Sequence, residues 1–215
     1  MQVADRPLAI SPYGNDGINK IYNLLFCDDT DLYETGAGAT SYPHNILFAE
    51  IPDVNKLNDI VNDESLETRY KTLAYHLLSK NAATINKKEL LGVIVEVALP
   101  EGLDVIAAYQ DGTARYINYT EKLLVWDTQT KESNEFVEQL FLHSDYVVKK
   151  IGPWDGARRP APIEGNVRLN FLVSGGLYFG EGPFDVLEKD PMGGPVIRSA
   201  AALMNYLIDK LIPGK

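Results

Sequence analysis

The chain has 215 residues, of which 45% are hydrophobic and 23% are charged, and its formal net charge is −10. This length and composition exclude disorder over the whole chain, and no disulfide or metal ion is needed to stabilise the core. The acidic charge excludes duplex nucleic acid as an expected partner, because it repels the phosphate backbone, whereas it favours solubility or docking to a basic protein.

The location of the protein follows from its single cysteine and its apolar runs. Cys27 has no second cysteine to pair with, which favours a reducing compartment. The first 14 residues contain Asp5, Arg6 and two prolines and lack the apolar run of a signal peptide. The richest apolar run, residues 90–99, is far shorter than the roughly 18 residues that a membrane helix needs. The sequence therefore predicts a cytoplasmic protein with no membrane partner.

The N-terminal part of the chain, residues 1–86, is predicted to be mainly helical. Apolar positions favour a short buried helix over residues 18–27, and residues 15–17 before it (Asn-Asp-Gly) supply turn and cap chemistry. A loop is expected over residues 28–43, where acidic and small residues gather. The apolar segment 46–51 does not favour either a helix or a strand.

Two more helices are expected before the chain changes character. Asp53 is a suitable cap for the first of them, and its apolar positions are Val54, Leu57, Ile60 and Val61. The second helix has apolar side chains spaced three and four positions apart, at Leu66, Tyr70, Leu73, Ala74, Leu77 and Leu78.

The segment that follows is typical of strands rather than helices. Runs rich in β-branched residues occupy 91–99 and 103–109, and the Asp-Gly pair at 111–112 favours a hairpin turn. Further short runs at 114–119 and 122–127 complete four strands. Because the connections are too short for parallel crossovers, the sequence predicts an antiparallel meander.

The rest of the chain is predicted to contain a helix, a hairpin and a last helix. The first helix covers residues 132–150, with an apolar stripe and a Gly-Pro stop after it. Strands at 167–173 and 177–179 are joined by Ser-Gly-Gly, and a helix over 196–212 has a broad apolar face. This helix should therefore pack against the sheet.

These elements predict an α+β fold. It consists of an antiparallel sheet, built from a four-strand meander plus a hairpin, with two helices of the C-terminal half packed on it. A mainly helical N-terminal region precedes the sheet. We expect residues 1–86 and 87–215 to form two domains, or one continuous domain.

The chain contains no strong motif for a cofactor, a metal or a catalytic nucleophile. It has no P-loop, no H-E-x-x-H, no C-x-x-C, no EF-hand loop and no G-x-S-x-G elbow. Gly36-Ala37-Gly38 begins like a dinucleotide fingerprint, but Ser41 stands in place of the third glycine and no strand precedes it. The sequence therefore predicts no cofactor and no metal.

Single titratable residues give no clear catalytic site either. His44, His76 and His143 lie far apart in the sequence, and two of them suit a helix surface. The acidic cluster at 28–31 could hold Mg²⁺ or Ca²⁺, but it lacks the pattern of a calcium loop and favours a solvated loop. The carboxylates next to Cys27 disfavour its thiolate, so an activated nucleophile is not expected.

The loop over residues 152–165 is the first candidate binding site. It carries Trp154, Arg158 and Arg159, and tryptophan and arginine are enriched at binding hot spots. Its prolines stiffen it and lower the entropy lost on binding. The alternative is structural: the tryptophan would fix the loop to the sheet, and the arginines would pair with nearby acids.

The second candidate is the segment that follows the last expected strand. Tyr178, Glu181 and Asp185 place an aromatic ring and two acids at one rim, while Gly180 and Gly182 let the backbone turn sharply. Ordinary turn chemistry is the alternative interpretation. If both loops lay at the same end of the sheet, they would line a cleft.

Two functional hypotheses follow, and a purely structural or assembly role is also open. The first is a non-catalytic binding or regulatory protein that acts through protein–protein contact, for example of inhibitor or immunity type, with an acidic face. The alternative is an enzyme or small-anion-binding protein with a cleft between the 152–165 and 178–195 loops. There the arginines would bind an anion and a carboxylate would move protons.

Overall fold

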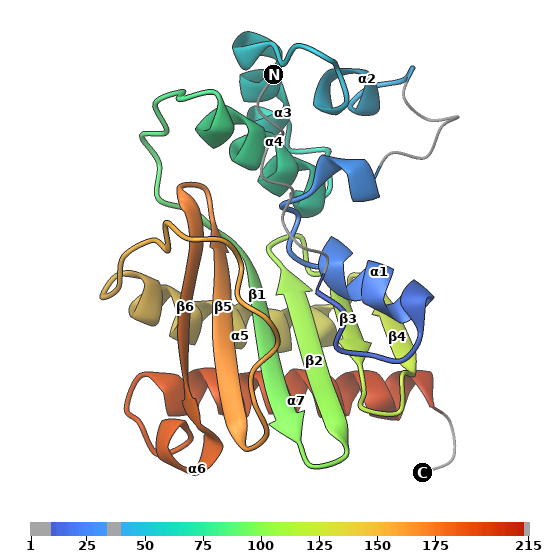
Figure 1. Ribbon diagram of the computed structural model, residues 1–215, viewed down its shortest axis with the longest axis vertical. Helices are drawn as coiled ribbons and strands as arrows, with labels where there is room; N and C mark the ends of the chain where they lie inside the picture. The colour runs from blue at the N-terminus through green and yellow to red at the C-terminus, as the bar shows by residue number, and fades with distance from the viewer. Residues whose placement is uncertain (1–9, 34–39, 213–215) are drawn as a thin grey trace.

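A computed structural model describes residues 10–33 and 40–212 of the chain. Its centre is a six-stranded antiparallel sheet with the strand order β4-β3-β2-β1-β5-β6 (Figure 1). The strands are β1 (Leu90–Leu99), β2 (Gly102–Tyr109), β3 (Ala114–Ile117), β4 (Leu123–Trp126), β5 (Asn166–Val173) and β6 (Gly176–Pro183). The predicted α+β class, with a four-strand meander and a hairpin, is confirmed.

Helices precede the sheet, connect its two parts and end the chain. The elements before the sheet are α1 (Asp16–Leu24), the 3₁₀ helix η1 (Thr30–Leu32), α2 (His44–Leu47), α3 (Val54–Asn62) and α4 (Thr68–Lys80). The later ones are α5 (Lys131–Val148), α6 (Phe184–Leu187) and α7 (Gly193–Leu211). Side-chain caps fix two of the starts: Asn15 accepts hydrogen bonds from the first turn of α1, and Asp53 does so for α3, as the sequence predicted.

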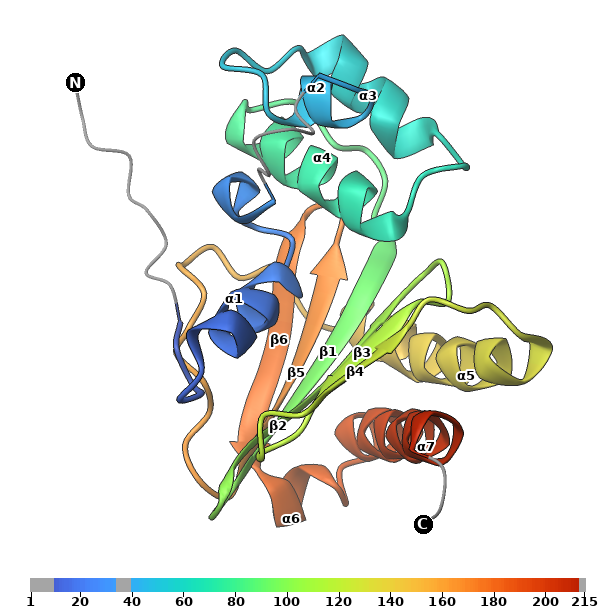
Figure 2. The ribbon, with the colours of Figure 1, turned by 90° about the vertical axis from the view of Figure 1, so that its right-hand side faces the viewer.

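The sheet is covered on both faces, as Figure 2 shows with the strands seen nearly edge-on. α1 lies on one face, which we call the α1 face, and α5 and α7 lie on the other, which we call the α7 face. The helices α2 to α4 lie at one end of the strands. Because side chains alternate along a strand, β1 sends Ile94 to the α1 face, and Val93 and Val95 to the α7 face.

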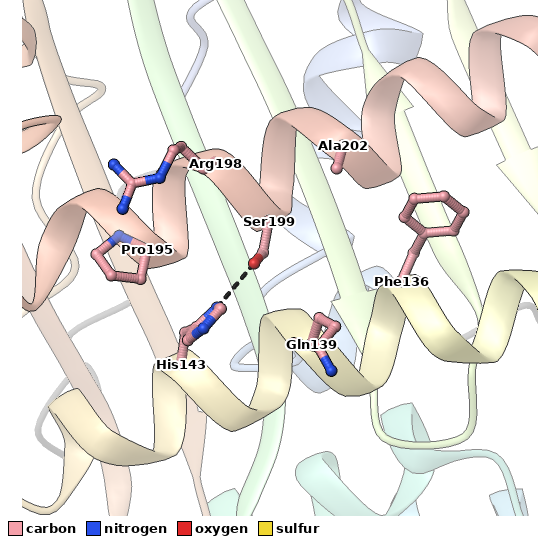
Figure 3. Close-up of a pocket in the computed structure, with 7 residues that line it drawn as sticks. All are labelled: Phe136, Gln139, His143, Pro195, Arg198, Ser199 and Ala202. Atoms are coloured by element: carbon pink, nitrogen blue, oxygen red, sulfur yellow. Dashed lines mark hydrogen bonds between the residues drawn. The ribbon is translucent and has the colours of Figure 1, made fainter.

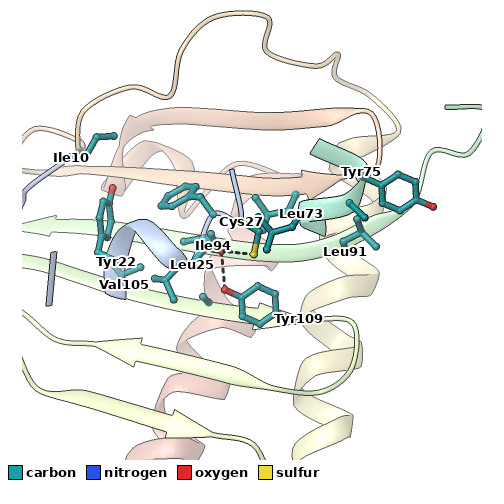
Figure 4. Packing of buried hydrophobic residues seen from close by; sticks show 14 of the residues in the cluster. Ile10, Tyr22, Leu25, Cys27, Leu73, Tyr75, Leu91, Ile94, Val105 and Tyr109 are labelled. Carbon is teal, nitrogen blue, oxygen red and sulfur yellow. Dashed lines mark hydrogen bonds between the residues drawn. The ribbon is translucent and has the colours of Figure 1, made fainter. Parts of the chain in front are cut away.

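Each face of the sheet has its own apolar core. On the α1 face, side chains from α1 and α4 pack against β1 and β2 (Figure 4), and Tyr109 donates a 2.8 Å hydrogen bond to the carbonyl of Leu25. Leu57 and Ile60 of α3 belong to the same cluster. On the α7 face, Leu140 of α5 and Leu203 of α7 are fully buried against the sheet. The N-terminal helices thus share a core with the sheet, and the division at residue 86 stays a prediction.

The hairpin and the loop after it differ in detail from the expected boundaries. β6 runs to Pro183 instead of ending near residue 179, because Gly180 pairs with Leu169 and Gly182 with Val167 on β5. A short helix, α6, occupies part of the expected 178–195 loop. The segment of undefined type at 46–51 is the end of α2 followed by irregular chain.

Candidate functional site

A buried carboxylate lies at the centre of the sheet on the α1 face. Glu96 of β1 is fully buried, and its Oε1 accepts a 2.6 Å hydrogen bond from Tyr22 of α1. Its Oε2 accepts a 2.8 Å hydrogen bond from Asn170 and lies 3.5 Å from Nη1 of Arg168, both on β5. Burial raises the pKa of Glu96, while the hydrogen bond from Tyr22 and the charge of Arg168 oppose that rise.

Arg168 extends this network to β6 and to the loop over residues 152–165. Its Nε donates to Oε2 of Glu181 at 2.9 Å, and its Nη2 lies 2.8 Å from the same oxygen. Arg159, in the loop, places Nη1 at 3.6 Å from that oxygen, and its carbonyl accepts a hydrogen bond from Arg168. The network therefore ties α1, the sheet and the loop together through charged side chains.

Arg158 points away from this network and reaches the segment around α1. Its side chain is only 7% exposed, and its Nε lies 3.2 Å from Oδ2 of Asp28. Nη2 donates to the side-chain oxygen of Asn23, and the guanidinium stands 4.1 Å from the centre of the Phe26 ring. Burial raises the pKa of Asp28, although the charge of Arg158 works against that rise.

A cavity of about 580 Å³ lies where the loop meets the N-terminal helices and the β5–β6 turn. Its apolar walls include Phe26, Tyr75, Trp154, Leu172 and Leu177. Its polar wall residues include Asp28, His76, Ser79, Lys80 and Arg158. A mainly apolar lining with a few polar groups, at this volume, is typical of small-molecule sites.

Four polar atoms of the cavity residues lack a hydrogen-bond partner within residues 10–33 and 40–212. They are Nε and Nη1 of Arg158, Oδ1 of Asp28 and Nε2 of His76, and all four are buried. Burial lowers the pKa of His76 to about 4, so its ring is neutral at pH 7. The charged residues of the wall are the cations Lys80 and Arg158 and the carboxylate Asp28, so the wall carries a net charge of +1. This sign is opposite to that of the whole chain.

The structure brings some of the predicted site residues together. Trp154 and Arg158 both line the cavity, and Arg159 pairs with Glu181. The structural interpretation of the tryptophan also has support. The main-chain N–H of Trp154 donates to the carbonyl of Leu177 at 2.7 Å, its indole N–H donates within the loop, and its ring packs edge-on against Phe179 at 5.2 Å.

Two predicted residues lie elsewhere. Tyr178 is buried on the α7 face, with the Lys88 ammonium 4.7 Å from its ring centre, because strand alternation turns it away from Phe179 and Glu181. Asp185 is exposed on α6. The cavity also differs from the expected cleft: the N-terminal helices form its second wall, and the segment 178–195 contributes none of its lining.

Glu96, Arg168 and Asn170 were not among the residues predicted from the sequence. A signal for them exists, because Arg168 and Asn170 alternate with apolar residues along β5 and therefore share one face. Glu96 interrupts an otherwise apolar strand. Burial raises the pKa of the Cys27 thiol to about 12, and the charge of Asp28, which the sequence had suggested as the cause, adds to that rise.

A second, smaller hollow of about 390 Å³ lies between α5 and α7 (Figure 3). There Nδ1 of His143 and Oγ of Ser199 are 2.8 Å apart, a distance at which a base can activate a nucleophile. Ser199, however, lies inside a helix, where backbone N–H groups are already bonded and cannot stabilise an oxyanion. The pair therefore acts as a hydrogen bond that joins the two helices.

Residues 10–33 and 40–212 contain neither a side-chain cluster for a metal ion nor a membrane-spanning helix. In these ranges no three His, Cys, Asp or Glu side chains are grouped so that they could hold a metal ion. None of the helices in the same ranges has the length and apolar character needed to cross a bilayer.

The chain matches no protein-family model, no curated protein and no solved structure.

Proposed function

We propose that this protein is a non-catalytic binding protein that holds a small organic anion in the cavity between the 152–165 loop and the N-terminal helices. The observation that carries the proposal is Arg158. Its guanidinium is buried at the cavity wall, stacked on Phe26, and keeps Nη1 without a hydrogen-bond partner in the described ranges. A buried cation with an unused donor favours an anionic ligand.

The charge and shape of the cavity support this proposal. Its wall carries a net charge of +1 in a chain with a net charge of −10, so an anion gains more here than on the acidic surface. The rings of Phe26, Tyr75 and Trp154 supply apolar area for an organic body. A small inorganic anion would leave that area uncovered, so an organic anion is the better match.

We favour binding over catalysis because the titratable groups of the cavity do not form a reactive set. Burial raises the pKa of the Cys27 thiol to about 12 and lowers that of His76, whose Nε2 has no hydrogen-bond partner within the described ranges. Asp28 is held in an ion pair with Arg158. An activated nucleophile would need a base within hydrogen-bond reach, and this arrangement does not provide one.

A fluorescent anion tests the proposal directly. The probe 8-anilinonaphthalene-1-sulfonate joins an aromatic body to a sulfonate, and its emission rises in apolar surroundings. We expect saturable binding to the native protein, weakened tenfold or more by Arg158→Met, which removes the charge but keeps most of the side-chain length. Arg159→Met, on the same loop but 52% exposed, is the matched control and should bind like the native protein.

The proposal fails if the native protein shows no saturable binding, or if Arg158→Met binds as tightly as Arg159→Met. Near-ultraviolet circular dichroism of each variant shows whether the tertiary packing is intact. A cavity-filling variant, Ser79→Trp, should also lower the affinity, because Ser79 lines the cavity. Ala201→Trp, on the exposed side of α7, is its control.

Contact with a basic protein partner, of inhibitor or immunity type, stays a second proposal. The net charge of −10 supports it, and Leu142 and Tyr146, one turn apart on α5 and 62% and 54% exposed, would serve as apolar anchors. If this proposal is right, Leu142→Ser with Tyr146→Ser should abolish capture of a partner from the native host while leaving the melting temperature unchanged. A cytoplasmic location also stays a prediction.

A further inference from the structure

The Arg158–Asp28 ion pair leaves hydrogen-bonding atoms unused on both sides. The two side chains meet through Nε and Oδ2, which are 3.2 Å apart. Nη1 of Arg158 and Oδ1 of Asp28 are both buried and have no partner in the part of the chain that the structure describes. Buried charged groups with unsatisfied atoms cost free energy, so a ligand that satisfies both would gain on both sides.

The two unused atoms require opposite partners. Nη1 is a donor and needs an acceptor, which a carboxylate provides, whereas Oδ1 is an acceptor and needs a donor, which an ammonium group provides. A simple anion would satisfy Arg158 but would leave Oδ1 of Asp28 without a donor. A ligand with both charges on neighbouring atoms would satisfy both side chains.

Resting on the proposed function, we infer that the ligand is a free α-amino acid with an apolar or aromatic side chain. Its carboxylate pairs with Arg158, its ammonium group pairs with Asp28, and its side chain contacts Phe26, Tyr75 and Leu177, which line the same cavity. Neither Nη1 of Arg158 nor Oδ1 of Asp28 is exposed to water in the structure. Binding therefore includes a small rotation of both side chains toward the cavity. A peptide would not match, because its two charged ends lie far apart.

Three ligands that differ by one charged group test this inference. L-phenylalanine carries both groups, 3-phenylpropionate lacks the ammonium group, and phenethylamine lacks the carboxylate. In isothermal titration calorimetry at pH 7, we expect L-phenylalanine to bind at least tenfold more tightly than either analogue. L-leucine and L-tryptophan, titrated in the same way, extend the test to other apolar side chains.

Two variants test whether the ammonium group of the ligand pairs with Asp28. Asp28→Asn keeps the size of the side chain but removes its charge, so it should abolish the advantage of L-phenylalanine over 3-phenylpropionate. Asp29→Asn is the matched control, because Asp29 caps the 3₁₀ helix η1 and does not line the cavity. That control should keep the tenfold advantage, and thermal melting shows whether both variants are folded.

The outcomes separate this inference from the proposed function. If 3-phenylpropionate binds as tightly as L-phenylalanine, the amino-acid inference is overturned while anion binding stands. The same holds if none of the amino acids binds but 8-anilinonaphthalene-1-sulfonate binds in an Arg158-dependent way. If no probe of either kind binds, both proposals are overturned.

Discussion

The hydrogen bond between Tyr22 and Glu96 should couple α1 energetically to the centre of the sheet. Its 2.6 Å length and the full burial of Glu96 place it among the charge-assisted bonds, whose net contribution is about 1.5–3 kcal/mol. Tyr22→Phe removes the donor and leaves Oε1 of Glu96 buried without this hydrogen bond. We expect this variant to lower the free energy of unfolding by about 2 kcal/mol.

Glu96→Gln perturbs the other end of the same bond. The amide oxygen can still accept from Tyr22, but the amide nitrogen then faces Asn170 and Arg168, which are both donors. We expect this change to cost about 3 kcal/mol, within the range for breaking a buried pair. Because Glu96→Gln turns the charge-assisted bond with Tyr22 into a neutral one, the double variant should cost about 1 kcal/mol less than the sum of the single variants.

Urea unfolding followed by far-ultraviolet circular dichroism measures all four proteins of this cycle. Tyr116→Phe is the matched control, because the Tyr116 hydroxyl also donates to a carboxylate, Asp104, but its ring packs on the α7 face. The losses of unfolding free energy caused by Tyr116→Phe and by Glu96→Gln should add up in the double variant to within about 0.5 kcal/mol. A coupling energy below about 0.5 kcal/mol for Tyr22 with Glu96 would refute the reasoning.

Four further predictions concern other parts of the molecule. Because burial lowers the pKa of His76 to about 4 from its ordinary value of 6.5, the unfolded chain binds the proton more readily and stability is lost as the pH falls through this range. Between pH 7.5 and 4.5, the unfolding free energy of the native protein should therefore fall by about 2 kcal/mol more than that of His76→Asn; equal losses would contradict this. Leu203→Asp places a charge at a fully buried position and should destabilise the fold by several kcal/mol, whereas Ala201→Asp, which is exposed, should melt like the native protein. Arg158→Ala should cost about 2 kcal/mol in urea unfolding because it unpairs a buried ion pair, and Arg159→Ala should cost no more than about 1 kcal/mol because the Arg159 side chain is 52% exposed; equal costs would count against the geometry. The net charge of −10 predicts no gel shift of duplex DNA at micromolar protein and physiological salt, and sub-micromolar binding would overturn that expectation.

The sheet could be predicted from the sequence because its signals are local. The Asp-Gly turn at 111–112 and the short connections of the meander allow one pairing pattern, and the structure has that pattern. The extent of β6 could not be predicted in the same way. Gly180 and Gly182 are typical of turns when read alone, yet they continue the strand because β5 offers them pairing partners.

The candidate site could be predicted only in part, because it is assembled from distant segments. The sequence indicated Trp154 and Arg158, which are unusual residues in a stiff loop. It could not indicate that Arg158 meets Asp28, since 130 positions of chain separate them and no local pattern encodes that contact. The burial of Glu96 was also not predictable from the strand alone, because its donors come from α1 and β5.

The central place of β1 has a consequence for how the chain folds. One edge of β1 pairs with β2, its neighbour in sequence, but the other edge pairs with β5, and the bonded residues Glu96 and Asn170 are 74 positions apart. Closing that long loop carries an entropic cost that local hairpins do not, so the meander should form before β5 docks. Until then β1 exposes an open edge that can pair with another chain, and Glu96 still lacks two of its partners. Slow docking of β5 would therefore make aggregation, rather than loss of secondary structure, the first symptom of variants that weaken the β1–β5 contact.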